Sequence, residues 1–290
     1  MLKRRRRFKR GGRPRSQTFH RLVPNIITVG ALCAGLTGIR FAISGQWEFA
    51  MIAILVAAIL DALDGTIARL LKAASDFGAE LDSLSDVVAF GVAPGLIIYF
   101  WSLSSIGGFG WAAALFFAVC CALRLARFNS TLETRPAYAY NFFTGVPAPG
   151  GALLALLPLL LSQEFGEGVF SHPAVTGPWI VAIALLMVSQ VPTFSLKTLR
   201  VPQRMVLPML VLIALLAAGL AGAPWLTLTI LSLIYLGSFP FSVRSFRKLR
   251  LEAESSAGKD GDQGTNAGDS GTPPATTTEN DGTLPRLREV

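Results

Sequence analysis

The two stretches of sequence that decide the fold of this chain are Ile59-Leu60-Asp61-Ala62-Leu63-Asp64-Gly65-Thr66-Ile67-Ala68-Arg69 and Gly78-Ala79-Glu80-Leu81-Asp82-Ser83-Leu84-Ser85-Asp86. Asp61 and Asp64 are three residues apart, and Asp82 and Asp86 are four apart. On a helix, each of these spacings places both side chains on one face. Because the loop between the stretches is short, the two helices are expected to be antiparallel neighbours. The sequence therefore predicts four carboxylates that face one another near one end of a helix pair.

The surroundings of these carboxylates are apolar. Hydrophobic residues make up 52% of the 290 residues, charged residues make up 15%, and the mean hydropathy is +0.52. A typical soluble chain carries about 25% charged residues, so this chain has too few polar side chains to cover a globular surface. The composition excludes a soluble enzyme and indicates a membrane protein.

Eight segments are apolar and long enough to be considered as membrane spans, each of which needs about 20 residues. They are residues 23–44, 48–70, 84–102, 109–127, 146–162, 175–194, 205–221 and 224–241. Short polar breaks separate them, as expected for helices joined by loops. We therefore expect an all-α fold, a polytopic membrane helical bundle of about eight transmembrane helices.

Basic residues are distributed unevenly along the chain. Ten of the 26 Lys and Arg lie within residues 1–21, and the loops on one side of the predicted spans hold no Lys or Arg. Because basic residues favour the cytoplasmic side, both termini and the carboxylates are expected on that side. The net charge of +8 then fits contact with anionic lipid headgroups, and nucleic acid is not an expected partner.

Four carboxylates in a poorly solvated place repel one another unless they are protonated, paired with cations or bound to metal. Arg69 and Lys72 are the only basic side chains from residue 59 to residue 86, too few to neutralise the group. Oxygen ligands without Cys or His favour Mg²⁺, Mn²⁺ or Ca²⁺. Two divalent ions would balance four carboxylates, and paired metals suit phosphoryl chemistry. A cation transporter that uses the same aspartates is the alternative from a different class.

The pattern Asp61-x2-Asp64-Gly65-x2-Ala68-Arg69-x8-Gly78-x3-Asp82-x3-Asp86 resembles in full the signature of the CDP-alcohol phosphatidyltransferases. The resemblance implies a six-helix catalytic core, a typical homodimer, and an enzyme that displaces CMP from a CDP-linked donor with an alcohol. It assigns Asp61, Asp64, Asp82 and Asp86 to a divalent metal site, with Asp82 bridging two ions and Mg²⁺ or Mn²⁺ as the metal. Asp86 is also the implied general base.

The same resemblance implies which residues contact the CDP moiety: Asn25, Thr28, Asp61, Gly65, Ala68, Arg69 and Gly78. Gly65 lies inside a predicted span, where glycine costs about 1 kcal/mol relative to alanine. Close packing of helices is the alternative reason for these small residues.

Three further stretches are similar to the bacterial integral-membrane phosphatidylserine synthases of this family: residues 122–129, 142–149 and 191–195. The similarity implies CDP-diacylglycerol and L-serine as substrates, and a bacterial inner membrane as the location. Arg124, Arg127 and Asn129 are the candidates for binding the serine carboxylate or a phosphate, because a guanidinium fork matches either group. Their alternative role is as membrane anchors that snorkel to headgroups. Glycerol 3-phosphate and inositol are alternative acceptors.

These observations divide the chain into four parts. Residues 1–22 are expected to form a basic cytoplasmic segment, and residues 23–200 the catalytic core of about six transmembrane helices. Residues 201–243 are expected to add two transmembrane helices. Residues 244–290 are poor in large apolar side chains and are expected to form a disordered cytoplasmic tail.

Overall fold

The structure is a computed structural model that describes residues 15–73, 75–131, 142–166, 168–189, 192–194 and 206–239. Most of the expected N-terminal segment and all of the expected C-terminal tail lie outside the described residues, so these two predictions stay predictions.

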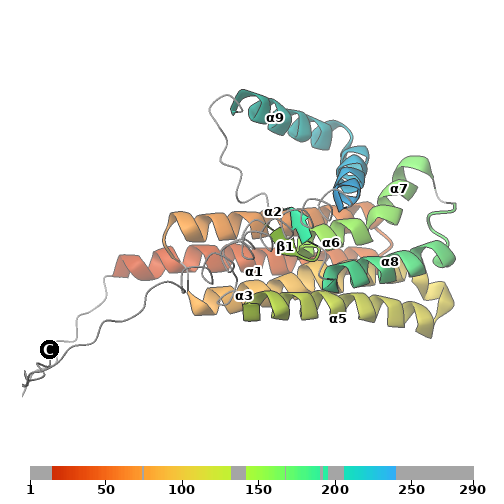
Figure 1. Ribbon diagram of the computed structural model, residues 1–290, viewed down its shortest axis with the longest axis horizontal. Coiled ribbons are helices and arrows are strands. Elements are labelled where there is room, and N and C mark those ends of the chain that lie inside the picture. Colours follow the sequence, from red (N-terminus) through yellow and green to blue (C-terminus); the bar gives the residue numbers. More distant parts are fainter. Residues whose placement is uncertain are drawn as a thin grey trace, which may run out of the picture. The chain divides into compact units, whose positions relative to one another are not determined.

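Long apolar helices dominate the described residues (Figure 1). Five are long and apolar enough to cross a membrane: Leu22–Ile43, Trp47–Leu70, Asp76–Trp101, Gly108–Ser130 and Ala148–Phe165. Three shorter apolar helices follow: Pro173–Val188, Leu207–Gly222 and Pro224–Phe239. Each of the eight overlaps one of the predicted spans. The structure therefore confirms the prediction of an all-α polytopic membrane bundle.

The first two spans are single helices, α1 (Arg15–Ile43) and α2 (Trp47–Leu70). They lie side by side along most of their length (Figure 1). Gly38 permits this approach, because a Cβ there would lie 3.3 Å from the Ala50 carbonyl oxygen of α2. Small residues at such contacts are what allows membrane helices to pack closely.

The third span changes its helical geometry where the second carboxylate pair ends. It begins as α3 (Asp76–Asp86), continues as the π-helical segment η1 (Val87–Val92) and ends as α4 (Ala93–Trp101). Ser75 caps its start, since the Ser75 Oγ accepts a hydrogen bond from the Gly78 amide at 3.1 Å. The periodicity of the sequence did not predict the π-helical segment. Such segments are frequent at functional sites.

The remaining elements follow along the chain. They are the 3₁₀ turn η2 (Leu103–Ile106), α5 (Gly108–Thr131), β1 (Phe142–Thr144), α6 (Ala148–Ala155), α7 (Leu157–Phe165), α8 (Pro173–Val188), β2 (Pro192–Phe194) and α9 (Val206–Gly222), followed by the helix Pro224–Phe239. Helix α9 is exposed along most of its length. Helices α6 and α7 together correspond to the predicted span 146–162, and the helix is interrupted at Leu156. Buried side chains from α2, η1, α4, α5, α6, α7 and α8 make up a common core.

The sixth span ends earlier than the sequence predicts. Residues 175–194 were expected to be one apolar helix, but α8 ends at Val188 and β2 follows. Pro192 explains part of the difference, because proline cannot continue a helix without losing a hydrogen bond. β2 pairs antiparallel with β1, so that Phe142 lies opposite Phe194 and Thr144 opposite Pro192. The strands join two segments that are distant in the sequence.

The close contact between η1 and α5 gives a test of this packing. A Cβ at Gly91 would lie 2.9 Å from the Cys121 Cβ, so Gly91→Leu should overpack the core and lower stability by about 1–3 kcal/mol or more. Gly237→Leu is the matched control, since no described atom lies within 4 Å of a Cβ at that position. Thermal unfolding of both variants in detergent measures the difference. Equal melting temperatures would contradict the close packing.

Candidate active site

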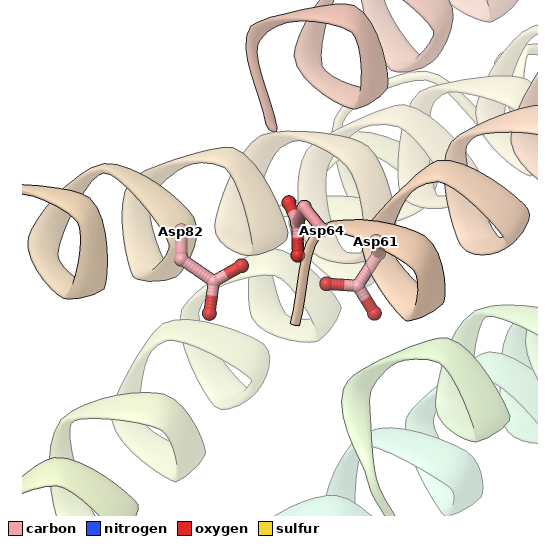
Figure 2. A group of neighbouring side chains, drawn as sticks. All are labelled: Asp61, Asp64 and Asp82. Carbon is pink, nitrogen blue, oxygen red and sulfur yellow. The ribbon is translucent and has the colours of Figure 1, made fainter. Parts of the chain in front are cut away.

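Three of the predicted carboxylates meet between α2 and α3. Asp61 and Asp64 lie on α2 and Asp82 lies on α3, and Figure 2 shows their side chains turned toward a common space. One carboxylate oxygen from each residue lies within 4.8 Å of the other two. The spacing of the aspartates in the sequence correctly predicts that the two helices bring them together.

Asp86 adjoins this group rather than belonging to its centre. It is the last residue of α3, immediately before η1. Its carboxyl group lies close to that of Asp61, so that the two groups interact electrostatically. Asp86 therefore lies at the edge of the three-carboxylate group. From there it can act on a molecule bound at the group, while the other three aspartates would remain the central metal ligands.

The donor set fits a hard divalent cation. Three carboxylates at this separation repel strongly unless a positive charge lies among them. The Arg69 guanidinium is exposed and donates to the Thr66 hydroxyl at 3.4 Å, so its described hydrogen bond is not to one of these carboxylates. Oxygen-only ligands suit Mg²⁺ and Mn²⁺. The residues that would hold such an ion are Asp61, Asp64 and Asp82.

Thr28 fixes the orientation of one of these carboxylates. Its Oγ lies 2.6 Å from the Asp64 Oδ2, to which the hydroxyl donates, and 3.1 Å from the Pro24 carbonyl oxygen. Both Thr28 and Asp64 are 4% exposed. A buried hydroxyl with this contact holds the carboxylate in one rotamer, as outer-shell groups commonly do at metal sites. Thr28 was predicted to contact the nucleotide, and its observed hydrogen bond is to Asp64.

Ser85 connects the same threonine to α3. The Ser85 Oγ donates to the Thr28 carbonyl oxygen at 3.2 Å, and Ser85 is buried. In this way α1 is hydrogen-bonded to both helices that carry the carboxylates. Sequence reasoning missed Ser85, although its position between Asp82 and Asp86 was a usable signal.

A polar hollow of about 160 Å³ lies beside Asp64 and Asp82. It brings together five of the residues predicted to contact CDP: Asn25, Thr28, Gly65, Ala68 and Gly78. Asp61 and Arg69, which belong to the same predicted set, do not line it. The structure thus places most, but not all, of the predicted nucleotide contacts around one space.

The two motif glycines on this hollow differ in their surroundings. A Cβ at Gly65 would have no described atom within 4 Å, whereas one at Gly78 would lie 2.9 Å from the Asn25 Oδ1. Helix packing therefore explains the small residue at Gly78 but not at Gly65. Gly65 leaves open space next to Asp64, which is the place a ligand of the carboxylate site would need.

The structure separates the three residues predicted to bind serine or phosphate. Arg124 lies near enough to Asp86 for its charge to act on that carboxyl group, and its guanidinium carbon is 6.0 Å from the centre of the Phe128 ring. Arg127 instead donates to the Val188 carbonyl oxygen at 2.8 Å. Because Val188 ends α8, this contact satisfies a terminal helix carbonyl.

Asn129 lies on a third surface. Its Nδ2 donates to the Ser83 Oγ of α3 at 2.9 Å. Arg124 and Arg127 were expected at the end of the span 109–127, and both lie on α5; Asn129 was expected beyond that span, but α5 continues to Thr131 and includes it. Their neighbours differ, however, and among the described residues Arg124 is the one of the three whose charge acts on a motif aspartate, Asp86.

Comparison with known proteins gives a consistent result. The family model of the CDP-alcohol phosphatidyltransferases matches residues 21–232. A CDP-diacylglycerol--serine O-phosphatidyltransferase of Mycobacterium tuberculosis is 41% identical over 247 residues, which cover 84% of this chain and 86% of that protein.

Two more distant bacterial proteins carry the same name. The protein of Helicobacter pylori is 39% identical over 176 residues, which cover 60% of this chain and 73% of that protein. The protein of Bacillus subtilis is 36% identical over 146 residues, which cover 48% of this chain and 80% of that protein.

The contact between Thr28 and Asp64 can be tested through metal affinity. Thr28→Val keeps the shape of the side chain and removes the hydroxyl, so the affinity for Mn²⁺ should fall by about 10–100-fold. Thr28→Ser should retain most of the affinity. Thr66→Val is the matched control on α2, because the exposed Thr66 hydroxyl donates to the Ala62 carbonyl oxygen. Electron paramagnetic resonance of free Mn²⁺ reports the affinity. Unchanged binding in Thr28→Val would show that the hydroxyl does not orient a ligand.

Proposed function

The chain belongs to the CDP-alcohol phosphatidyltransferase family, and from this premise we propose that it transfers the phosphatidyl group of CDP-diacylglycerol to the hydroxyl of L-serine. The products are phosphatidylserine and CMP. The observation that carries the proposal is the 41% identity over 84% of the chain to an enzyme named for this reaction. The carboxylate group between α2 and α3 lies within the matched residues and supplies a site for the chemistry.

The chain's own residues divide the work of phosphoryl transfer. Asp61, Asp64 and Asp82 would hold the divalent ions, Mg²⁺ or Mn²⁺ and two in number. When bound, such ions neutralise the charge that builds on the phosphates and on the CMP leaving group. The open space at Gly65 and the hollow lined by Asn25 and Ala68 would receive the nucleotide.

Asp86 is the proposed general base. A serine hydroxyl is a weak nucleophile until a base takes its proton. Asp86 borders the three-carboxylate group at the end of α3, close to Asp61. From this edge, it would accept the proton of an acceptor hydroxyl, while the donor phosphates would be bound through the divalent ions that the other carboxylates would hold.

Arg124 is the proposed contact for the serine carboxylate. Its charge acts on Asp86, so an acceptor bound to its guanidinium would have a hydroxyl within the neighbourhood of the base. Arg127 binds the end of α8 through the Val188 carbonyl oxygen. Asn129 contacts Ser83, the neighbour of Asp82 on α3. We assign these two residues to positioning the helices around the acceptor.

Other acceptors and another class of function were considered above. An enzyme that uses glycerol 3-phosphate or inositol would rely on the same carboxylate chemistry. It would differ only in the pocket that binds the acceptor. Ion transport is disfavoured by family membership and by the gathering of Asp61, Asp64 and Asp82 in one group, since a transport path needs sites near the middle of the membrane.

The protein is an integral membrane protein, and we propose its sidedness from the charge pattern. The concentration of Lys and Arg before residue 22 and after residue 243 favours cytoplasmic termini. The active site would then face the cytoplasm at the bacterial inner membrane, where serine is available. Homodimerisation is proposed from the family alone.

The reaction can be tested with purified protein, CDP-diacylglycerol and divalent metal. CMP release should depend on added serine and exceed the release with glycerol 3-phosphate or inositol. EDTA should abolish it, and Mg²⁺ or Mn²⁺ should restore it. Asp82→Asn should lower turnover by orders of magnitude. It should also lose the stabilisation that bound metal gives the wild type, which is about 2.7 kcal/mol of unfolding free energy at 100 times Kd and is measured as a rise in melting temperature. Full activity in EDTA would exclude the metal site, and a preference for inositol would reassign the acceptor.

Arg124 and Arg127 are a matched pair for testing acceptor recognition. Lysine keeps the charge of arginine and loses the bidentate fork. Arg124→Lys should therefore raise the KM for serine about tenfold or more and change the KM for CDP-diacylglycerol much less. Arg127→Lys should mainly lower thermal stability, because its contact is to the end of α8. A larger effect of Arg124→Lys on the lipid substrate would move Arg124 to the donor phosphates.

A further inference from the structure

A second hollow in the protein is entirely apolar. It has a volume of about 260 Å³ and lies among α2, η1, α6, α7 and the helix Pro224–Phe239. Every residue that lines it is apolar, and the walls include Met51, Ile54, Ala58, Phe90, Leu153 and Leu231. One water molecule takes about 30 Å³ of liquid, so the space is far larger than a packing defect. A cavity without polar partners does not hold ordered water.

The cavity begins one helical turn from the carboxylates. Ala58 precedes Asp61 by three residues on α2, and Phe90 follows Asp86 by four residues. At 1.5 Å per residue, Met51 lies about 15 Å from Asp61 along the helix axis. The cavity therefore extends from the Asp61 and Asp86 side of the site deep into the apolar bundle.

The two hollows lie on different sides of the carboxylate group. The polar one is bounded by Asp64 and Asp82, and the apolar one adjoins Asp61 and Asp86 through their helical neighbours Ala58 and Phe90. A molecule with a charged phosphate at the carboxylates could thus extend a polar part to one side and an apolar part to the other.

The helix Pro224–Phe239 closes the cavity on one side. It packs closely against part of α6, since a Cβ at Gly150 would lie 3.0 Å from the Tyr235 Cε1. One turn earlier, Leu231 lines the cavity and is 40% exposed. The Leu231 side chain therefore reaches both the cavity and the outer surface of the helices.

We propose that this cavity binds one acyl chain of the lipid donor, so that the helix Pro224–Phe239 is part of the substrate site. The inference rests on the proposed function, in which CDP-diacylglycerol places its pyrophosphate at the carboxylates. Its acyl chains are joined to that phosphate through glycerol alone, so they must enter apolar space within a few bonds of the site. The cavity at Ala58 and Phe90 is such a space, and its walls fix the chain and, through it, the reacting phosphate.

Chain-length selectivity tests this proposal. Leu231→Trp fills the cavity from an exposed position, which lowers the risk of misfolding. Rates are measured with dihexanoyl and dipalmitoyl CDP-diacylglycerol in mixed micelles. The ratio of kcat/KM for the long donor to that for the short donor should fall about tenfold or more, because a displaced chain moves the phosphate out of line. Leu233→Trp is the matched control, since Leu233 is exposed on the same helix and does not line the cavity. An unchanged ratio in Leu231→Trp, or the same fall in both variants, would overturn the proposal.

A second measurement uses the unmodified protein. CDP-diacylglycerol with a diazirine at the end of an acyl chain should crosslink to Met51, which is 3% exposed and lines the cavity. Ile52 and Val56 lie on the same helix and are each 41% exposed, so labelling of these residues alone would mean that the chains stay in the surrounding lipid and would refute the cavity site. Crosslinking does not need turnover. A protein that labels at Met51 but releases no CMP with any acceptor would retain the acyl site and lose the proposed reaction.

Discussion

Repulsion among the carboxylates of α2 and α3 is the constraint on which the rest of the structure depends. Their oxygens lie within 4.8 Å of one another, and a pair of unit charges at that distance costs about 3 kcal/mol at an effective dielectric constant of 20. The repulsion energy of several such pairs is larger than the stabilisation that one surface contact provides. The helices must therefore be held together by packing elsewhere. Gly35 shows how this is done, since a Cβ there would lie 2.7 Å from the Ala89 Cα. Close contacts of this kind hold α1, η1 and α5 around a site that would otherwise push its helices apart.

Helix α1 contributes to this site without contributing a carboxylate. Thr28 receives a hydrogen bond from Ser85 of α3 and donates one to Asp64 of α2. The distance between the two helices is thereby tied to one residue of a third helix. The π-helical segment begins directly after Asp86. The change in helical geometry thus falls between the last carboxylate and Phe90, the residue that borders the apolar cavity. The same short segment shapes both the polar and the apolar side of the site.

The sequence predicted those features that follow from spacing along one helix. The intervals between Asp61 and Asp64 and between Asp82 and Asp86 were enough to place the carboxylates together, and apolar length was enough to predict the spans. Features that depend on contacts between helices could not be predicted in this way. Periodicity does not show that Arg127 reaches the end of α8 while Arg124 faces Asp86, because both lie on the same end of α5. The pairing of β1 with β2 was missed for the same reason, since it joins residues about fifty positions apart.

A reaction between a lipid and a water-soluble acceptor needs a site that presents two environments to one phosphate. The polar hollow beside Asp64 and the apolar cavity that begins at Ala58 provide them within two turns of α2. This arrangement explains why the carboxylates lie inside a span, where charges are costly, rather than in a loop. A phosphate held outside the membrane would require the acyl chains to leave the hydrocarbon region, at about 0.8 kcal/mol for each methylene exposed to water. Placing the charges at the depth of the phosphate avoids that cost, and a divalent cation held by Asp61, Asp64 and Asp82 would offset the repulsion among the carboxylates.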